Sequence, residues 1–168
     1  MGMIDSVLAE LDREAKTTER VFERIPEDKL GWRPHEKSMS LGQLALHIAN
    51  TPGAISAMAI PDTFEIRPSA FKERPVPANR TEVFETYRQG LAAAKESLSK
   101  LDDATLMATW QLTQDGKPLM AVPRIGFLRS IMLNHSYHHR GQLSVYLRLL
   151  NVPVPSIYGP SADESPFG

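Results

Sequence analysis

Three histidines lie within five residues near the end of the chain, at positions 135, 138 and 139. On a helix successive residues are about 100° apart around the axis, so His135 and His139 are about 40° apart on one face. His138 is about 100° from His139 and lies on the flank of that face. Because two imidazoles one turn apart suit neighbouring ligand positions of a tetrahedral or octahedral ion, this spacing predicts a pair of metal ligands.

A third ligand is expected from a different helix, and His47 is the best candidate. It lies about 60° from Leu44, on the flank of the apolar face of its predicted helix, where it could turn toward the pair. Three neutral imidazoles leave one or more positions open, which is the arrangement of a catalytic site. The alternative stays open that these histidines are core residues bonded to backbone carbonyls.

Other polar side chains near the histidine pair have less specific roles. Gln142 is about 20° from His135, and it is expected either to hold a water or substrate beside the metal or to be a buried amide bonded to a neighbouring helix. Tyr137 and Arg140 point about 160° and 140° away from His135, which favours a solvated or subunit-facing position. His35 is expected to be solvated in a loop.

Four stretches with apolar residues at spacings of three and four predict the helices that carry these side chains. They run from about 4 to 25, from 40 to about 60, from about 79 to 101 and from 123 to about 150. Ser40 and Asn79 match the start of a capping box, with Gln43 and Glu82 three residues on. In the last stretch the apolar residues fall within about 60° of His135, which predicts that the histidine pair lies in the middle of the buried face. These apolar residues are Leu128, Ile131, Met132, Tyr146, Leu149 and Leu150.

The segments between the predicted helices differ in character. Thr51, Pro52 and Gly53 predict a kink or a restart within the second helix. Residues 61–79 hold four prolines and are expected to form an irregular crossover, long enough to join helices that are not antiparallel neighbours. Between 109 and 122 two short apolar runs flank Asp115 and Gly116, a dipeptide typical of hairpin turns.

These elements predict an all-α fold, a four-helix bundle with a small hairpin between its third and fourth helices. The tail from about residue 151 is expected to lie over the bundle without helical structure. Residues 1–168 together have the length of a single domain with a real hydrophobic core.

Composition excludes several classes of protein. The chain has no cysteine, which excludes a disulfide, a zinc–thiolate site and a cysteine nucleophile. Lys and Arg number 19 and Asp and Glu 20, and no basic stripe follows one helix face, so nucleic-acid binding has no support. The N-terminus lacks the layout of a signal peptide, and no apolar run approaches the ~20 residues of a membrane span. We therefore expect a soluble, cytoplasmic protein.

Three segments together resemble the DinB-like (YfiT-like) family of metal-dependent enzymes. They are residues 38–49, with the Leu-Ala-Leu-His run that ends at His47, residues 135–143, with the His-His-Arg-Gly-Gln run, and residues 149–155. With the four predicted helices, the resemblance covers essentially the whole chain. It implies a bundle of up-down-down-up type, a homodimer built through helix faces, and a nickel or zinc ion held by His47, His135 and His139.

The resemblance also implies a class of reaction. Some members of that family are thiol transferases or thiol-dependent isomerases that use a low-molecular-weight thiol such as bacillithiol or mycothiol. The leading hypothesis is therefore a thiol-dependent transferase that acts on a small-molecule electrophile. Because the chain has no cysteine, the thiol must be a cosubstrate.

Two alternatives remain, a metal-assisted hydrolase and a non-catalytic metal-binding stress-response dimer. No Glu or Asp stands beside the histidines as in the H-E-x-x-H motif, so hydrolysis through that motif is unsupported. The three nitrogen donors by themselves suit zinc, nickel, iron and copper alike.

Overall fold

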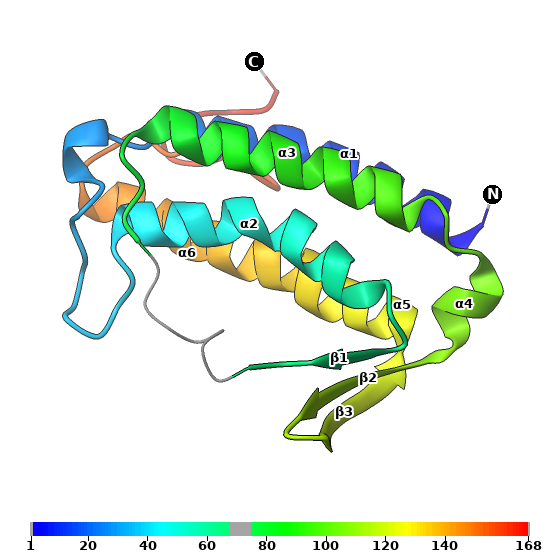
Figure 1. Ribbon diagram of the computed structural model, residues 1–168. Coiled ribbons are helices and arrows are strands. Elements are labelled where there is room, and N and C mark those ends of the chain that lie inside the picture. The colour runs from blue at the N-terminus through cyan, green and yellow to red at the C-terminus, as the bar shows by residue number, and fades with distance from the viewer. Residues whose placement is uncertain (1, 68–74, 168) are drawn as a thin grey trace.

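The computed structural model describes residues 2–67 and 75–167, and its helices lie side by side along one direction (Figure 1). The first three long helices are α1 (Met3–Glu23), α2 (Leu41–Ala59) and α3 (Arg80–Leu98). The last is formed by α5 (Arg124–Phe127), a π-helical segment (Leu128–Asn134) and α6 (His135–Leu149), which follow one another without a break. A 3₁₀ turn (Glu27–Lys29) and a short helix, α4 (Asp103–Met107), complete the helical structure of the described residues.

The helices α2 and α3 run in the same direction, whereas α1 and α6 run in the opposite one (Figure 1). Two parallel helices that are consecutive in the sequence need a connection as long as the helix itself, which explains the long segment between them. They pack closely, since a Cβ added at Gly53 would lie 2.9 Å from the Cα of Gly90. Gly90 therefore lowers the helix propensity of α3 but permits this contact.

The helix α2 begins where the sequence predicts and differs in its middle. The Ser40 hydroxyl accepts from the backbone N–H of Gln43, and the Gln43 side chain accepts from the backbone N–H of Ser40, which completes a capping box. Pro52 lies inside one continuous helix, so the predicted restart at Thr51 is wrong. Pro52 has no backbone N–H and so cannot donate a helical hydrogen bond. In the same turn the Thr51 hydroxyl donates to the carbonyl of His47 at 2.8 Å, which adds a side-chain hydrogen bond.

The core is apolar and is shared by all four long helices. It also includes Trp110, which stacks on Phe127 with ring centroids 3.8 Å apart and donates from Nε1 to the carbonyl of Met58. Phe22 and Tyr87 meet edge to face between α1 and α3. The pKa of the Tyr87 phenol is raised to about 12, chiefly because the ring is buried.

A three-stranded sheet lies at one end of the helices (Figure 1), so the predicted all-α fold with one small hairpin is confirmed only in part: the fold is mostly helical. The hairpin of β2 (Thr109–Gln114) and β3 (Lys117–Pro123) is present, and its turn residues Asp115 and Gly116 both have positive φ, as a two-residue hairpin turn requires. The unexpected strand is β1 (Thr63–Glu65), which pairs parallel with β2. Three residues are too few to show an alternating pattern, so β1 gives no signal in the sequence.

Arg124 fastens this sheet to the helices. Its side chain is fully buried, and its guanidinium donates to the carbonyls of Ala59 at 2.7 Å and Thr105 at 2.6 Å and to the carboxylate of Asp62 at 2.5 Å. It thus caps the end of α2 and joins it to α4 and to the start of β1. The predicted irregular crossover of 61–79 is therefore partly ordered here, while its residues 68–74 lie outside the described part of the chain.

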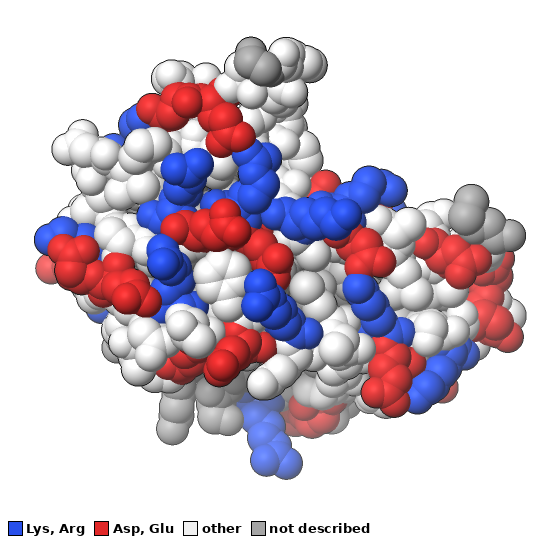
Figure 2. Space-filling model, turned by 90° about the horizontal axis from the view of Figure 1, so that it is seen from above, with Lys and Arg blue, Asp and Glu red and all other residues white. Residues whose placement is uncertain are grey.

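The tail from residue 151 to 167 has no helix or strand and lies across the bundle. Asp163 pairs with Arg148 of α6, and Glu164 pairs with Arg20 of α1. The face formed by α1 and α3 carries intermixed acidic and basic side chains (Figure 2), including the pairs Lys95–Asp12 and Arg88–Glu19. Within the described residues, no helix combines the length and apolar character required to cross a bilayer.

Candidate metal centre

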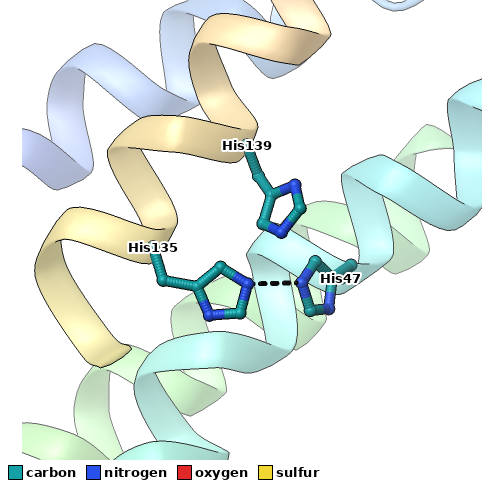
Figure 3. Close-up of side chains that lie close together, drawn as sticks. All are labelled: His47, His135 and His139. Carbon is teal, nitrogen blue, oxygen red and sulfur yellow. Dashed lines mark hydrogen bonds between the residues drawn. The ribbon is translucent and has the colours of Figure 1, made fainter. Parts of the chain in front are cut away.

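Three imidazole rings from two helices meet between α2 and α6 (Figure 3). His47 is in the second turn of α2, and His135 and His139 occupy the first two turns of α6. Nε2 of His47 lies 3.0 Å from Nε2 of His135, and the ring of His139 lies 4.4 Å from that of His47 and 4.5 Å from that of His135 between centroids. The structure thus brings together the three residues that the sequence singles out.

The geometry of these three rings fits one small divalent ion. One donor nitrogen from each ring can be chosen so that all three lie within 4.8 Å of one another. In a tetrahedral site with metal–nitrogen distances of about 2.0–2.1 Å, neighbouring nitrogens are roughly 3.3 Å apart. The 3.0 Å separation of His47 and His135 therefore needs only a small adjustment to admit an ion.

The histidine pair lies at the edge of the buried face of α6, and its predicted place in the middle of that face is wrong. Leu143 and Leu147 are fully buried at about 80° and 120° from His135, whereas Leu149 is 56% exposed. His135 and His139 are consequently half-buried, as is His47. Donors at such an edge are held by the core yet stay accessible from outside it.

The helix before His135 explains part of this difference. Residues 128–134 are π-helical, so each N–H bonds to the carbonyl five residues earlier and each residue turns less than in an α-helix. The 100° rule therefore misplaces residues on the N-terminal side of His135. Leu133, which that rule leaves outside the apolar stripe, is buried with Leu128 and Met132. Such π-helical insertions frequently accompany functional sites.

Gln142 lies beside the candidate ligands. Its Oε1 is 2.9 Å from Nδ1 of His139, and its Nε2 is 3.4 Å from the hydroxyl of Tyr146. Tyr146 is buried and contacts the ring of Trp32 edge to face, which places the loop before α2 next to this cluster.

The other two histidines lie outside the cluster. The ring of His138 touches that of His139 with centroids 4.8 Å apart, but His138 is exposed on the flank of α6. His35 is exposed in its loop, as expected, and its Nδ1 accepts from the backbone N–H of Lys37. Among the described His, Asp and Glu side chains, the cluster of His47, His135 and His139 is the group that could hold an ion, and it includes no carboxylate.

The opposite side of α6 holds a buried ionic network that sequence reasoning misses. Arg140 is 1% exposed, and its guanidinium donates to the carboxylate of Glu14 at 2.6 Å and to the hydroxyls of Thr18 at 3.1 Å and Tyr158 at 2.5 Å. The expected solvated position of Arg140 is therefore wrong. No local pattern signals this network, since its partners Glu14 and Tyr158 lie 126 and 18 residues from Arg140 in the sequence.

Tyr137 belongs to the same network. Its hydroxyl donates to the carboxylate of Glu10 at 2.9 Å, and the Arg140 guanidinium lies 5.2 Å from its ring centroid and 5.1 Å from that of Tyr158. Burial, together with the hydrogen bond to Glu10, raises the pKa of Tyr137 well above its usual value. Burial and the bond to Glu14 likewise raise the pKa of Tyr158. Tyr137 is thus half-buried in the network and not fully solvated, while a subunit-facing position stays a prediction.

Comparison with known proteins places this chain in a family. The sequence model of the DinB family matches residues 2–166. The uncharacterized protein YrdA of Bacillus subtilis (strain 168) is 26% identical over 162 residues, which are 96% of this chain and 91% of YrdA.

Two solved structures have the same fold. A DinB-like protein from Bacillus cereus ATCC 10987 aligns with a TM-score of 0.71 at 26% identity, covering 92% of this chain and 97% of that one. The DinB-like protein YjoA of Bacillus subtilis aligns with a TM-score of 0.65 at 22% identity, covering 87% and 92%, a likeness of fold alone. Since the family model spans nearly every residue, the chain belongs to the DinB family.

Proposed function

We propose that this protein is a metal-dependent transferase that joins a low-molecular-weight thiol to a small electrophile. In this proposal His47, His135 and His139 hold one divalent ion, nickel or zinc. The observation that carries the proposal is the convergence of three half-buried imidazoles from two helices, with donor atoms within 4.8 Å of one another. Three neutral nitrogen donors leave positions open for a substrate, as in catalytic sites.

In this proposal the residues of the chain would hold one ion and orient the rings around it. An ion held by three imidazoles would act as a Lewis acid that lowers the pKa of a thiol or water, and it would so supply a nucleophile at neutral pH. The helix α6 holds His135 and His139 one turn apart, and its packing against α2 brings His47 next to them. The bond between Gln142 and Nδ1 of His139 restricts rotation of that ring.

The chemical balance of the reaction requires a thiol from outside the chain, because the sequence has no cysteine. The S–H bond of the cosubstrate breaks and its proton passes to solvent. A carbon–sulfur bond then forms at the electrophile while the leaving group departs with its electron pair. With an epoxide, the carbon–oxygen bond opens instead and the oxygen takes up a proton.

The test is a conjugation assay with the metal-loaded protein. Nickel-loaded and zinc-loaded samples are incubated with bacillithiol, mycothiol or glutathione and with monobromobimane or an epoxide. We expect metal-dependent product formation above the spontaneous rate, lost in the double variant H135A/H139A and kept in the matched control His138→Ala. Absence of metal-dependent conjugation with every one of these thiols would overturn the transferase.

Two further outcomes separate the alternatives. Hydrolysis of ester or amide substrates without added thiol would indicate a metal-assisted hydrolase with the same ligands. Elemental analysis that finds less than about a tenth of an ion per chain after loading, where a site of this type holds about one, would overturn both enzymes and favour a non-catalytic protein.

The proposal extends to fold and assembly. The parallel course of α2 and α3 supports the up-down-down-up four-helix bundle that the family resemblance implies. Val145 and Leu149, each 56% exposed and one turn apart on α6, support a homodimer formed through a helix face. Sedimentation of the intact protein at several concentrations tests this assembly.

A further inference from the structure

We propose that the N-terminal cap of α2 determines which nitrogen of His139 carries the imidazole proton, acting through Tyr146 and Gln142. In this proposal Tyr146 and Gln142 are positioning residues, and they leave Nε2 of His139 free of a proton and directed at the ion. The inference rests on the proposed metal site and adds a reason why one ligand presents the correct nitrogen. A metal-binding imidazole generally needs its other nitrogen fixed by a hydrogen bond.

The chain of contacts starts at the peptide bond between Met39 and Ser40. Its N–H donates to Oε1 of Gln43 at 2.8 Å within the buried capping box. The preceding loop is fastened to the same helix end, because the carbonyls of Leu30 and Trp32 accept from the first N–H groups of α2. The carbonyl oxygen of Met39 is therefore held in a fixed direction.

Tyr146 connects this carbonyl with the interior of α6. Its side chain is buried, packs edge to face on Trp32 with centroids 5.7 Å apart, and places its hydroxyl 3.4 Å from the oxygen of Met39. A carbonyl oxygen can only accept a hydrogen bond, so the hydroxyl proton of Tyr146 points to Met39. The hydroxyl oxygen then has only lone pairs to offer to its other neighbour.

That neighbour is the amide of Gln142, 3.4 Å away. Because the tyrosine oxygen can only accept from this side, the NH₂ end of the amide must face it. The reversed amide would bring its oxygen against the lone pairs of Tyr146 as long as that hydroxyl donates to Met39, so the Tyr146 contact decides the orientation of the amide. The Oε1 of Gln142 consequently faces Nδ1 of His139 at 2.9 Å.

The same reasoning fixes the imidazole. An amide oxygen only accepts, so Nδ1 of His139 carries the proton and donates to Gln142. In a neutral imidazole the remaining nitrogen, Nε2, then has the lone pair. Figure 3 shows the ring of His139 with one nitrogen directed toward the rings of His47 and His135.

The consequence is that α2 acts on the site twice. It contributes His47 directly, one turn beyond the capping residue Gln43. Through its cap it also sets the proton position on His139, a ligand of the opposite helix. Both ligands thus depend on one rigid helix end.

The test reads the tautomer of His139 in the metal-free protein. Long-range nitrogen–proton NMR spectra of ¹⁵N-histidine-labelled protein in alkaline buffer, where imidazole is neutral, distinguish protonated from bare ring nitrogens. We expect Nδ1–H to dominate in the wild type. Tyr146→Phe should raise the fraction of Nε2–H and weaken nickel or zinc binding about 10-fold, as loss of a residue that orients a ligand does.

A matched background isolates the mechanism. In Gln142→Glu the carboxylate accepts from Nδ1 whichever way it turns, so adding Y146F to Q142E should change neither the tautomer nor the affinity for the metal. Gln142→Leu, which removes the acceptor, should shift the tautomer as Y146F does and provides the same reading if Y146F folds poorly. Urea unfolding of each variant identifies effects on stability alone.

The results separate this inference from the proposed function. A wild type with Nε2–H on His139, or a tautomer ratio unchanged in both Y146F and Q142L, overturns the inference even if the protein binds nickel or zinc. A wild type that binds neither ion overturns the proposed function, while the tautomer measured without metal still decides the inference.

Discussion

The two sides of α6 differ in how their polar groups are satisfied. Toward α1 and the tail, Arg140 is buried with one carboxylate and two hydroxyls as acceptors, so its charge is compensated within the chain. Toward α2, His135 and His139 meet His47 and no carboxylate of the described residues joins them. The first side is an ionic network in which the charges are paired within the chain. The second side is a cluster of three imidazoles without a carboxylate.

The difference indicates what each side is suited to do. Burying a charge is unfavourable unless it is paired and hydrogen-bonded, so a closed network fixes one helix against another. A cluster of imidazoles can share a proton between two rings, as the 3.0 Å contact between His47 and His135 allows, but a divalent ion joins all three. We therefore expect the arginine side to set stability and the histidine side to set metal binding.

The largest expected effect is on metal binding, in a variant that changes only the histidine side of α6. Replacing both histidines of α6 in H135A/H139A removes two of the three donors, and we expect nickel and zinc binding to fall more than 100-fold. Because these rings are half-buried at the edge of the core, the free energy of unfolding of the metal-free protein should change far less than in an Arg140 variant. Isothermal titration with each metal and urea unfolding measure the two quantities.

His138→Ala is the control on the same helix, since this ring is exposed and lies outside the cluster. Its metal affinity should equal that of the wild type. If H138A loses as much affinity as the double variant, the ligands have been assigned to the wrong residues.

The next largest effect is on the free energy of unfolding, in a variant that changes only the arginine side of α6. Arg140→Met keeps the length of the side chain but leaves Glu14 without its guanidinium, and breaking a buried pair in this way lowers the free energy of unfolding by about 3–5 kcal/mol. The folded fraction should still bind the metal with wild-type affinity. Urea unfolding, followed by metal titration under folding conditions, checks both statements.

Arg148→Met supplies the matched comparison, since Arg148 lies on the surface of the same helix and pairs with Asp163 of the tail. Exposed pairs contribute little because water screens them, so unfolding of this variant should resemble that of the wild type. Equal destabilisation by the two substitutions would contradict the distinction between a buried network and surface charge.

The sequence predicts the histidine side better than the arginine side, for a physical reason. His135 and His139 are one turn apart in an α-helix, so local geometry relates them without knowledge of the fold. Arg140 is satisfied by Glu14 and Tyr158, which are far from it in sequence, and only the packing of α1 and the tail reveals them. The same limit hides Arg124, whose acceptors come from two separate stretches of the chain, residues 59–62 and Thr105.

The fold shows the same division between local and distant interactions. The capping box at Ser40 and the Asp-Gly hairpin turn are decided by neighbouring residues, and both are present. The strand β1 exists because β2 offers it a partner some 48 residues away, and the π-helical segment departs from the period on which helical faces are predicted. That second reason explains the error for the residues before His135, such as Leu133.

The smallest expected effect is a pH dependence of the stability that Tyr137 contributes on the arginine side of α6. Tyr137 keeps its phenol protonated in the folded state, because burial and the bond to Glu10 raise its pKa above the ordinary value of 10.0. In the unfolded chain the phenol ionises above about pH 10, so the stabilisation is complete below that pH and is lost as the pH rises beyond it. Tyr137→Phe removes this hydrogen bond, which contributes about 1–2 kcal/mol at neutral pH.

Urea unfolding from about pH 8 to pH 11 measures this contribution. The difference in the free energy of unfolding between wild type and Y137F should shrink above pH 10. A difference that stays constant or grows over that range would mean that the phenol is not held in its neutral form by the network.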